Sequence, residues 1–148
     1  MIKTIFYIII LVLRALASLT GCGQGKNLSG TERAAVLSFS EATTDNLFAG
    51  LAANDYATFS RDFDSDLYVR LPTTDFAAWK QDLDNQLGNY LSRQMDQVTQ
   101  SDEFYVVVYQ AKFEQEAQVT VSVAFHASDH TFALLSFESE QYSWSAWD

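Results

Sequence analysis

The fold is decided by the second half of the chain, where residues 103–126 read EFYVVVYQAKFEQEAQVTVSVAFH. The first part, residues 103–114, is dense in Val and aromatic residues, which favour strands. Residues 117–126 alternate with a period of two, as expected of a strand with one buried face. Short polar turns follow each run, so we expect antiparallel neighbours. The buried face would carry Val119, Val121, Val123 and Phe125, and the other face Gln118, Thr120, Ser122, Ala124 and His126.

Two further strand candidates lie on either side of this hairpin. Residues 90–99 (YLSRQMDQVT) precede it, and residues 131–138 (TFALLSFE) follow it. The second half of the chain therefore predicts an antiparallel sheet of about four strands.

The preceding segment has helical periodicity instead. A first helix opens near Ser29 or Thr31 and is expected to end at Asn54, and a short second helix follows with Tyr56, Phe59 and Phe63 at helical spacing. A third begins at Thr73 and stops at Gly88. The apolar stripe of the first helix is Val36, Phe39, Thr43, Leu47 and Leu51, and that of the third is Phe76, Trp79, Leu83 and Leu87. Helices followed by strands predict an α+β domain over residues 31–140, with three N-terminal helices packed on one sheet face and an aromatic tail at 141–148.

The N-terminus has the features of a secretion signal. Lys3 is followed by nine apolar residues, Ile5–Leu13, which is too short for a transmembrane helix of about 20 residues. Residues 19–22 (Leu-Thr-Gly-Cys) match the bacterial lipobox pattern, in which the thiol carries the lipid because only a thiol is nucleophilic enough. We therefore expect a signal peptide at 1–21, lipidation of Cys22, and a flexible Gly-rich tether at 22–30.

This interpretation predicts an extracytoplasmic location for the protein. It would be a lipoprotein attached to a bacterial membrane through Cys22, on the cell surface or the periplasmic side. Arg14 places a charge directly at the end of the apolar run, which is unusual for a signal peptide. An uncleaved membrane anchor with an incidental cysteine is the alternative interpretation.

Charge and cysteine content exclude several classes of function. Residues 1–21 hold two of the nine basic residues and none of the nineteen acidic ones, so the rest of the chain has a formal charge of −12. Such a surface repels phosphate backbones, which argues against nucleic-acid binding. One cysteine allows neither an intrachain disulfide nor a Cys-based zinc site.

The order of motifs resembles a known superfamily. Asn54-Asp55-Tyr56 with Phe59, then Phe63-Asp64, a Trp79 helix ending in Gly, and the strand 103–108 are similar to the nuclear transport factor two-like (cystatin-like cone) superfamily. Within it, the chain most resembles a small family of unknown function found in bacterial lipoproteins. The resemblance implies a curved sheet wrapped around the helices, with a pocket at the open end of the cone. Its members include isomerases, dehydratases and non-catalytic pockets, so the fold does not transfer an activity.

Five aromatic residues are candidates for lining such a pocket, and packing in the core is the alternative for each. His126, Asp129 and His130 form a loose polar group, but metal ligands on a strand would be spaced i, i+2, so we expect exposed turn histidines. We assign no catalytic residue, metal site or cofactor. The candidate pocket residues are Tyr56, Trp79, Tyr105, Tyr109 and Phe113.

Three hypotheses of function follow from these features. The first is a lipid-anchored module at the cell surface that binds a small apolar ligand or a protein partner without catalysis. The second is a small cone-fold enzyme of the isomerase or dehydratase kind, which requires a carboxylate within hydrogen-bond reach of a Tyr inside a closed cavity. The third is a structural or homodimerisation module that uses the sheet face or the tail.

Overall fold

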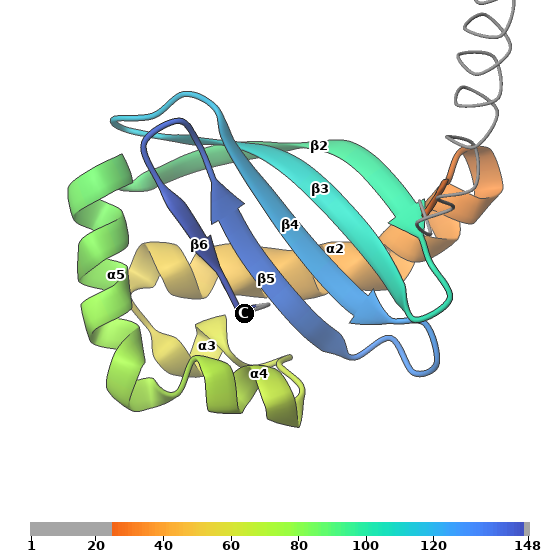
Figure 1. Ribbon diagram of the computed structural model, residues 1–148, viewed down its shortest axis with the longest axis horizontal. Helices are drawn as coiled ribbons and strands as arrows, with labels where there is room; N and C mark the ends of the chain where they lie inside the picture. The colour runs from red at the N-terminus through yellow and green to blue at the C-terminus, as the bar shows by residue number, and fades with distance from the viewer. Residues whose placement is uncertain (1–24, 147–148) are drawn as a thin grey trace, which may run out of the picture.

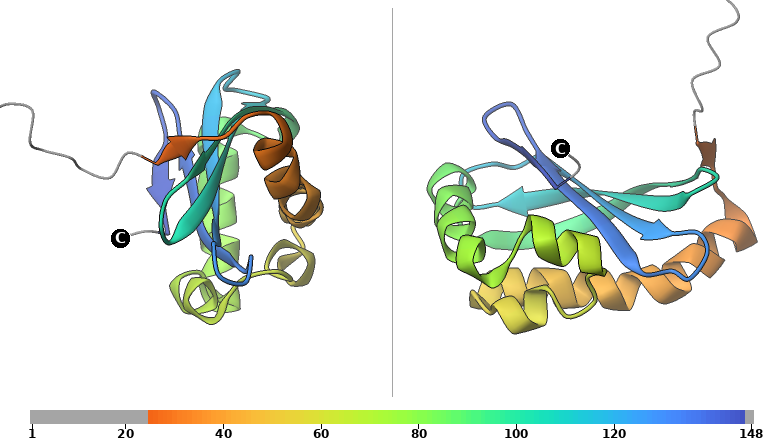
Figure 2. Two further views of the ribbon diagram at one scale, coloured as in Figure 1. Left: turned by 90° about the vertical axis from the view of Figure 1, so that its right-hand side faces the viewer. Right: turned by 60° about the horizontal axis from the view of Figure 1, so that its bottom comes forward.

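The computed structural model describes residues 25–146, which form four helices and a six-stranded antiparallel sheet (Figures 1 and 2). The strands follow one another across the sheet in chain order. Figure 1 shows α2 running along the sheet and α5 crossing one end of it. The helices are α2 (Gly30–Ala53), α3 (Tyr56–Phe59), α4 (Ser65–Arg70) and α5 (Thr73–Leu87), and the strands are β1 (Lys26–Asn27), β2 (Tyr90–Gln100), β3 (Phe104–Phe113), β4 (Val119–His126), β5 (Phe132–Glu138) and β6 (Ser143–Ser145).

The α+β class and the four long strands predicted from the sequence are confirmed. The predicted numbers are wrong, because residues 25–146 contain four helices rather than three and six strands rather than about four. The two additional strands are short edges. β1 pairs with the end of β2, within the range expected to be a tether, and β6 pairs with β5 within the expected tail. Strands of two and three residues are too short to show a periodicity in the sequence.

The additional helix, α4, comes from local capping. The Asp64 carboxylate accepts a hydrogen bond from the backbone N–H of Leu67 at 2.7 Å, which satisfies one of the free donors at a helix start. Phe63 therefore does not continue α3, which ends at Phe59. Six residues are fewer than two turns, so α4 has no apolar stripe to reveal it.

The longest helix, α2, ends in tight contact with α3. Asn54 adopts the left-handed conformation (φ 52°) and its N–H reaches the carbonyls of Gly50 and Leu51. A Cβ atom on Gly50 would lie only 2.1 Å from the backbone nitrogen of Phe59. Only glycine therefore allows α3 to pack directly across α2.

The core lies between the helices and the inward face of the sheet. The alternation predicted for β4 is confirmed for Val119, Val121, Val123 and Phe125, which are buried, and for His126, which is partly exposed. It is wrong for Ala124, which was expected on the other face and is fully buried, because the pairing of β4 with β5 shifts register between Ala124 and Phe125. Register shifts interrupt β2 at two places, and such bulges bend a strand. The largest fully buried side chains are Tyr109, Phe59, Phe113, Phe125, Phe132, Phe137, Leu47, Leu51, Leu67, Leu83, Leu87 and Leu135.

Candidate functional site

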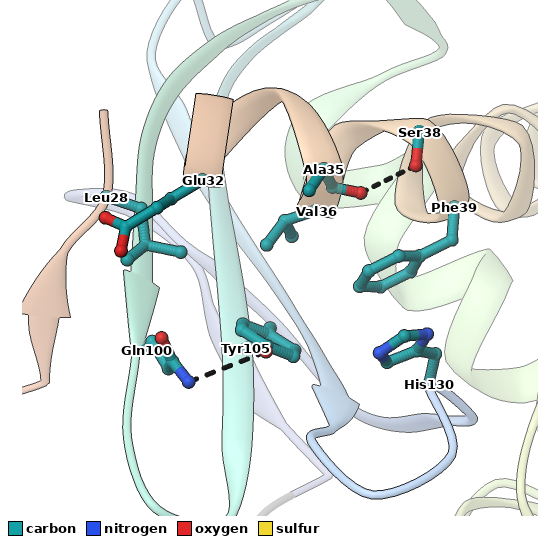
Figure 3. A pocket seen from close by; sticks show the side chains of 9 residues that line it. All are labelled: Leu28, Glu32, Ala35, Val36, Ser38, Phe39, Gln100, Tyr105 and His130. Carbon is teal, nitrogen blue, oxygen red and sulfur yellow. Dashed lines mark hydrogen bonds between the residues drawn. The ribbon is translucent and has the colours of Figure 1, made fainter. Parts of the chain in front are cut away.

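A groove of about 530 Å³ opens between the first turns of α2, the adjoining ends of β2 and β3, and the β4–β5 turn (Figure 3). We call it the N-terminal groove. Its volume falls within the range of about 300–1,000 Å³ typical of small-molecule sites. The groove is lined by Leu28, Glu32, Ala35, Val36, Ser38, Phe39, Gln100, Tyr105 and His130.

The floor of the groove is apolar because a short connection and a helix face both place aliphatic side chains there. Leu28 follows β1 directly and is fixed by its backbone N–H, which donates to the Val98 carbonyl at 2.8 Å. Leu28 and Val36 are almost completely buried, at 7% and 3% exposure, whereas Ala35 is exposed at the rim. An apolar group entering the groove would therefore meet a preformed apolar surface.

One wall of the groove consists of three aromatic rings. The Phe39 and His130 rings stack with centroids 4.0 Å apart and planes at 2°. The Tyr105 ring lies 5.9 Å from Phe39 and 5.8 Å from His130. Figure 3 shows these side chains from α2, β3 and the β4–β5 turn pointing toward one another. The wall thus joins three segments that are far apart in the sequence.

His130 supplies its ring from an unfavourable backbone conformation. Its φ of +62° lies in the left-handed region, which costs most L-residues about 1–2 kcal/mol. Its backbone N–H closes the turn by donating to the His126 carbonyl at 2.9 Å. Gly or Asn would satisfy such a turn more readily, so this position retains an imidazole at a conformational cost.

The other side of the groove is polar. Glu32 accepts two hydrogen bonds from the Lys26 ammonium, at 2.7 and 2.8 Å, and both side chains are more than half exposed. The Gln100 amide reaches the Tyr105 hydroxyl at 3.5 Å, a weak contact that leaves both groups free to bond a ligand. The groove therefore offers an apolar floor beside two neutral hydrogen-bonding groups, Gln100 and Tyr105, and one carboxylate, Glu32, that is paired with Lys26.

A partly buried polar cluster lies farther along α2 and joins that helix to the sheet, with Tyr109 buried and Asp45 exposed. The Tyr109 hydroxyl donates to Glu41 at 2.6 Å, and Arg93 reaches Asp45 at 2.8 Å and Glu41 at 3.3 Å. The Arg93 guanidinium also lies over the rings of Phe48 and Tyr109, at 5.2 and 5.0 Å from their centroids.

The enzyme hypothesis requires a carboxylate that is hydrogen-bonded to a Tyr inside a closed cavity. The Tyr109–Glu41 pair provides the hydrogen bond. Burial, followed by the hydrogen bond to Glu41, raises the pKa of the Tyr109 phenol far above its usual value near 10. A phenol with a raised pKa is a poor acid at neutral pH. Neither residue lines the N-terminal groove or the second pocket described next, so the pair does not face a substrate space there. Its contacts connect α2 to β2 and β3 and therefore stabilise the packing of the helix on the sheet.

A second pocket of about 420 Å³ lies between the β2–β3 connection and the β4–β5 turn, lined by Asp102, Glu103, Phe104, His126 and Ser128. The His126 ring is 3.0 Å from the Asp64 carboxylate, which joins the end of β4 to the start of α4. His130 instead stacks in the groove, and Asp129 accepts hydrogen bonds from Thr131. Within residues 25–146, no group of three or more His, Cys, Asp or Glu side chains is arranged to hold a metal ion.

Of the five predicted pocket residues, Tyr105 lines the N-terminal groove. Tyr56 is partly buried and donates its hydroxyl proton to the Leu71 carbonyl at 2.8 Å. Trp79, Tyr109 and Phe113 lie in the core, at 8%, 1% and 1% exposure. Of the five, Tyr105 alone lines the N-terminal groove, and none lines the pocket beside His126.

The sequence-based prediction missed most of the groove. Val36 and Phe39 were assigned to the apolar stripe of the first helix, and that stripe is the signal that could have found them. Leu28, Gln100 and His130 lie in a linker, at a strand end and in a turn, where no periodicity points inward. The predicted lipidation site, Cys22, lies outside the described residues.

In the part of the chain that the structure describes, no helix combines the length and apolarity needed to cross a bilayer. No curated protein and no solved structure matches the chain significantly. One family model does match, over residues 44–133, which is more than half of the chain. This span includes Gln100, Tyr105 and His130 of the groove, whereas the part of α2 that lines it lies before residue 44. The chain therefore belongs to the family described as Protein of unknown function (DUF3887).

Proposed function

We propose that this protein is a lipid-anchored, extracytoplasmic binding domain that holds a small, mainly apolar ligand in the N-terminal groove without catalysing a reaction. The lipobox at residues 19–22 supports the location, and the groove supports the binding. The enzyme hypothesis has less support, because the Tyr109–Glu41 pair lies outside both pockets.

The observation that carries the proposal is His130. A left-handed backbone still costs about 1 kcal/mol for a histidine, which tolerates this region better than most residues. The His130 ring stacks on Phe39 and completes the groove wall. Strain of this kind persists where surrounding structure enforces it, and it is concentrated at binding sites. The exposed ring contributes little to the core, so its place in the wall is the more direct reason for its presence.

The test is a fluorescence titration with N-phenyl-1-naphthylamine, an uncharged probe that emits strongly in apolar surroundings. Ala35→Trp would fill the mouth of the groove from an exposed helix position. Ala34→Trp is the matched control, because Ala34 is also exposed on α2 but does not line the groove.

We expect saturable binding by the wild-type protein and by Ala34→Trp. Ala35→Trp should weaken binding by about tenfold, which corresponds to about 1.4 kcal/mol of lost contact. Equal affinities for the two tryptophan variants, with unchanged thermal melting, would show that the probe does not use the groove and would remove the proposal's main support.

A further inference from the structure

We propose that the ligand of the N-terminal groove is a hydrocarbon chain of an uncharged or zwitterionic membrane lipid, taken from the bilayer to which Cys22 attaches the domain. This inference rests on the binding function proposed above and specifies its ligand. Three features support it: where the chain enters the domain, how polarity is distributed in the groove, and the charge around it.

The groove lies beside the point at which the N-terminal segment joins the fold. β1 pairs with the end of β2, where Lys26 faces Gln100, and Gln100 lines the groove. The backbone of Gly25 is packed so closely there that an added Cβ would be 3.0 Å from the Gln100 carbonyl oxygen. This end of the groove is thus fixed to the first described residue of the chain.

The remaining distance to the proposed anchor is short. Cys22 precedes Gly25 by three residues, and three extended residues span at most about 11 Å. A lipid on Cys22 would therefore hold Gly25, and the adjoining end of the groove, close to the membrane surface. At that distance, lipids of the bilayer are by far the most concentrated apolar molecules available to the groove.

The groove has the polarity of a site for an amphiphile. Leu28, Val36 and Phe39 offer apolar surface from the β1–α2 connection and α2, whereas the Gln100 amide and Tyr105 hydroxyl lie on the opposite side (Figure 3). A hydrocarbon chain could bury its methylene groups against the first set, at about 0.8 kcal/mol per buried CH₂. Ester or hydroxyl groups of the same lipid would then meet neutral hydrogen-bond partners.

The charges select against anionic lipids. The chain from Cys22 onward has a formal charge of −12, and Glu32 lies in the lining itself. Lys26, the basic residue beside this end of the groove, is paired with Glu32 at 2.7 Å, so its charge is offset by a carboxylate of the lining. An uncharged or zwitterionic head group avoids this repulsion.

The experiment uses the full chain reconstituted in phosphatidylcholine vesicles that contain a small fraction of phosphatidylcholine with a photoactivatable diazirine on one acyl chain. After irradiation, cross-linked peptides are identified by mass spectrometry. We expect cross-links to the segment from Lys26 to Phe39 and to residues around Tyr105. They should decrease by about tenfold in Ala35→Trp and persist in Ala34→Trp.

Two further comparisons distinguish delivery from the membrane, the identity of the ligand and the binding function itself. Cys22→Ser should release the protein from the vesicles and lower the cross-linking at equal lipid concentration, because the groove is no longer held at the bilayer. Unchanged cross-linking in the released variant would overturn delivery from the anchoring membrane, and a variant that stays bound to the vesicles would overturn attachment through Cys22. A different result would be that the groove peptides carry no cross-links although the protein binds N-phenyl-1-naphthylamine and Ala35→Trp weakens that binding. This result would overturn the lipid assignment and leave the binding function standing. Loss of both signals would overturn the proposed function itself.

Discussion

Replacing His130 with glycine should separate ligand binding from folding. The substitution removes the imidazole from the groove wall and places at φ +62° a residue that adopts this conformation freely. We therefore expect a variant that is folded and close to wild-type stability but binds the apolar probe less tightly.

The magnitude follows from two opposing terms. Relief of the left-handed backbone stabilises the fold by about 1 kcal/mol, at the lower end of the usual range because His tolerates this region better than most residues. Loss of the stacked contact with Phe39, at 4.0 Å, and of the contact with Tyr105, at 5.8 Å, costs about 1 kcal/mol. The free energy of unfolding should thus change by less than about 1 kcal/mol.

The assay pairs urea denaturation with titration by N-phenyl-1-naphthylamine. Losing one wall of the site should raise the probe's dissociation constant by about fivefold, equivalent to about 1 kcal/mol. Asn54→Gly is the matched control: Asn54 is the other described non-glycine residue with positive φ (52°), and it caps α2 away from the groove. That variant should be equally stable or more stable and should bind the probe normally.

Two results would refute this reasoning. A loss of stability of about 3 kcal/mol in His130→Gly would mean that the ring is a structural support of the fold rather than part of a binding wall. Unchanged probe affinity in a folded His130→Gly variant would mean that the ligand does not touch the imidazole.

Further predictions concern the framework around the groove. Gly50→Ala should destabilise the protein by about 2 kcal/mol in urea unfolding, because its Cβ would overlap the Phe59 backbone; a neutral effect would contradict the close packing of α3 on α2. Burial raises the pKa of the Tyr142 phenol to about 12 and, together with Glu41, that of Tyr109 still further. The folded state favours the neutral form of both phenols. Their contribution to the free energy of unfolding is therefore complete below pH 10 and is lost as the pH rises above 10, by about 1.4 kcal/mol per pH unit for each tyrosine. Urea melts between pH 8 and 11 measure the slope, which Tyr109→Phe should reduce by half; an unchanged slope would contradict the assignment. Asp64→Ala should cost about 1 kcal/mol through loss of the α4 cap, and Asp64→Asn, which retains a capping oxygen, should cost less.

The sequence by itself determined the succession of elements. The density of Val and aromatics in residues 103–114 predicted β3, and alternation in residues 117–126 predicted β4 together with its buried residues Val119, Val121, Val123 and Phe125. These signals are local, since the period of a strand or helix is read within one segment. For the same reason α4, β1 and β6 escaped prediction, because each is too short to show a period.

Tertiary structure alone decided which side chains meet. Phe39 and Val36 belong to an ordinary apolar stripe, and nothing in residues 127–131 indicates that His130 would stack on Phe39. That contact depends on the backbone angle of one turn residue and on the angle at which α2 crosses the sheet. Likewise, Tyr109 alternates like any strand residue, and only the packing of α2 provides Glu41 as its partner. Pairing between distant segments is set by global packing, so local patterns carry no information about it.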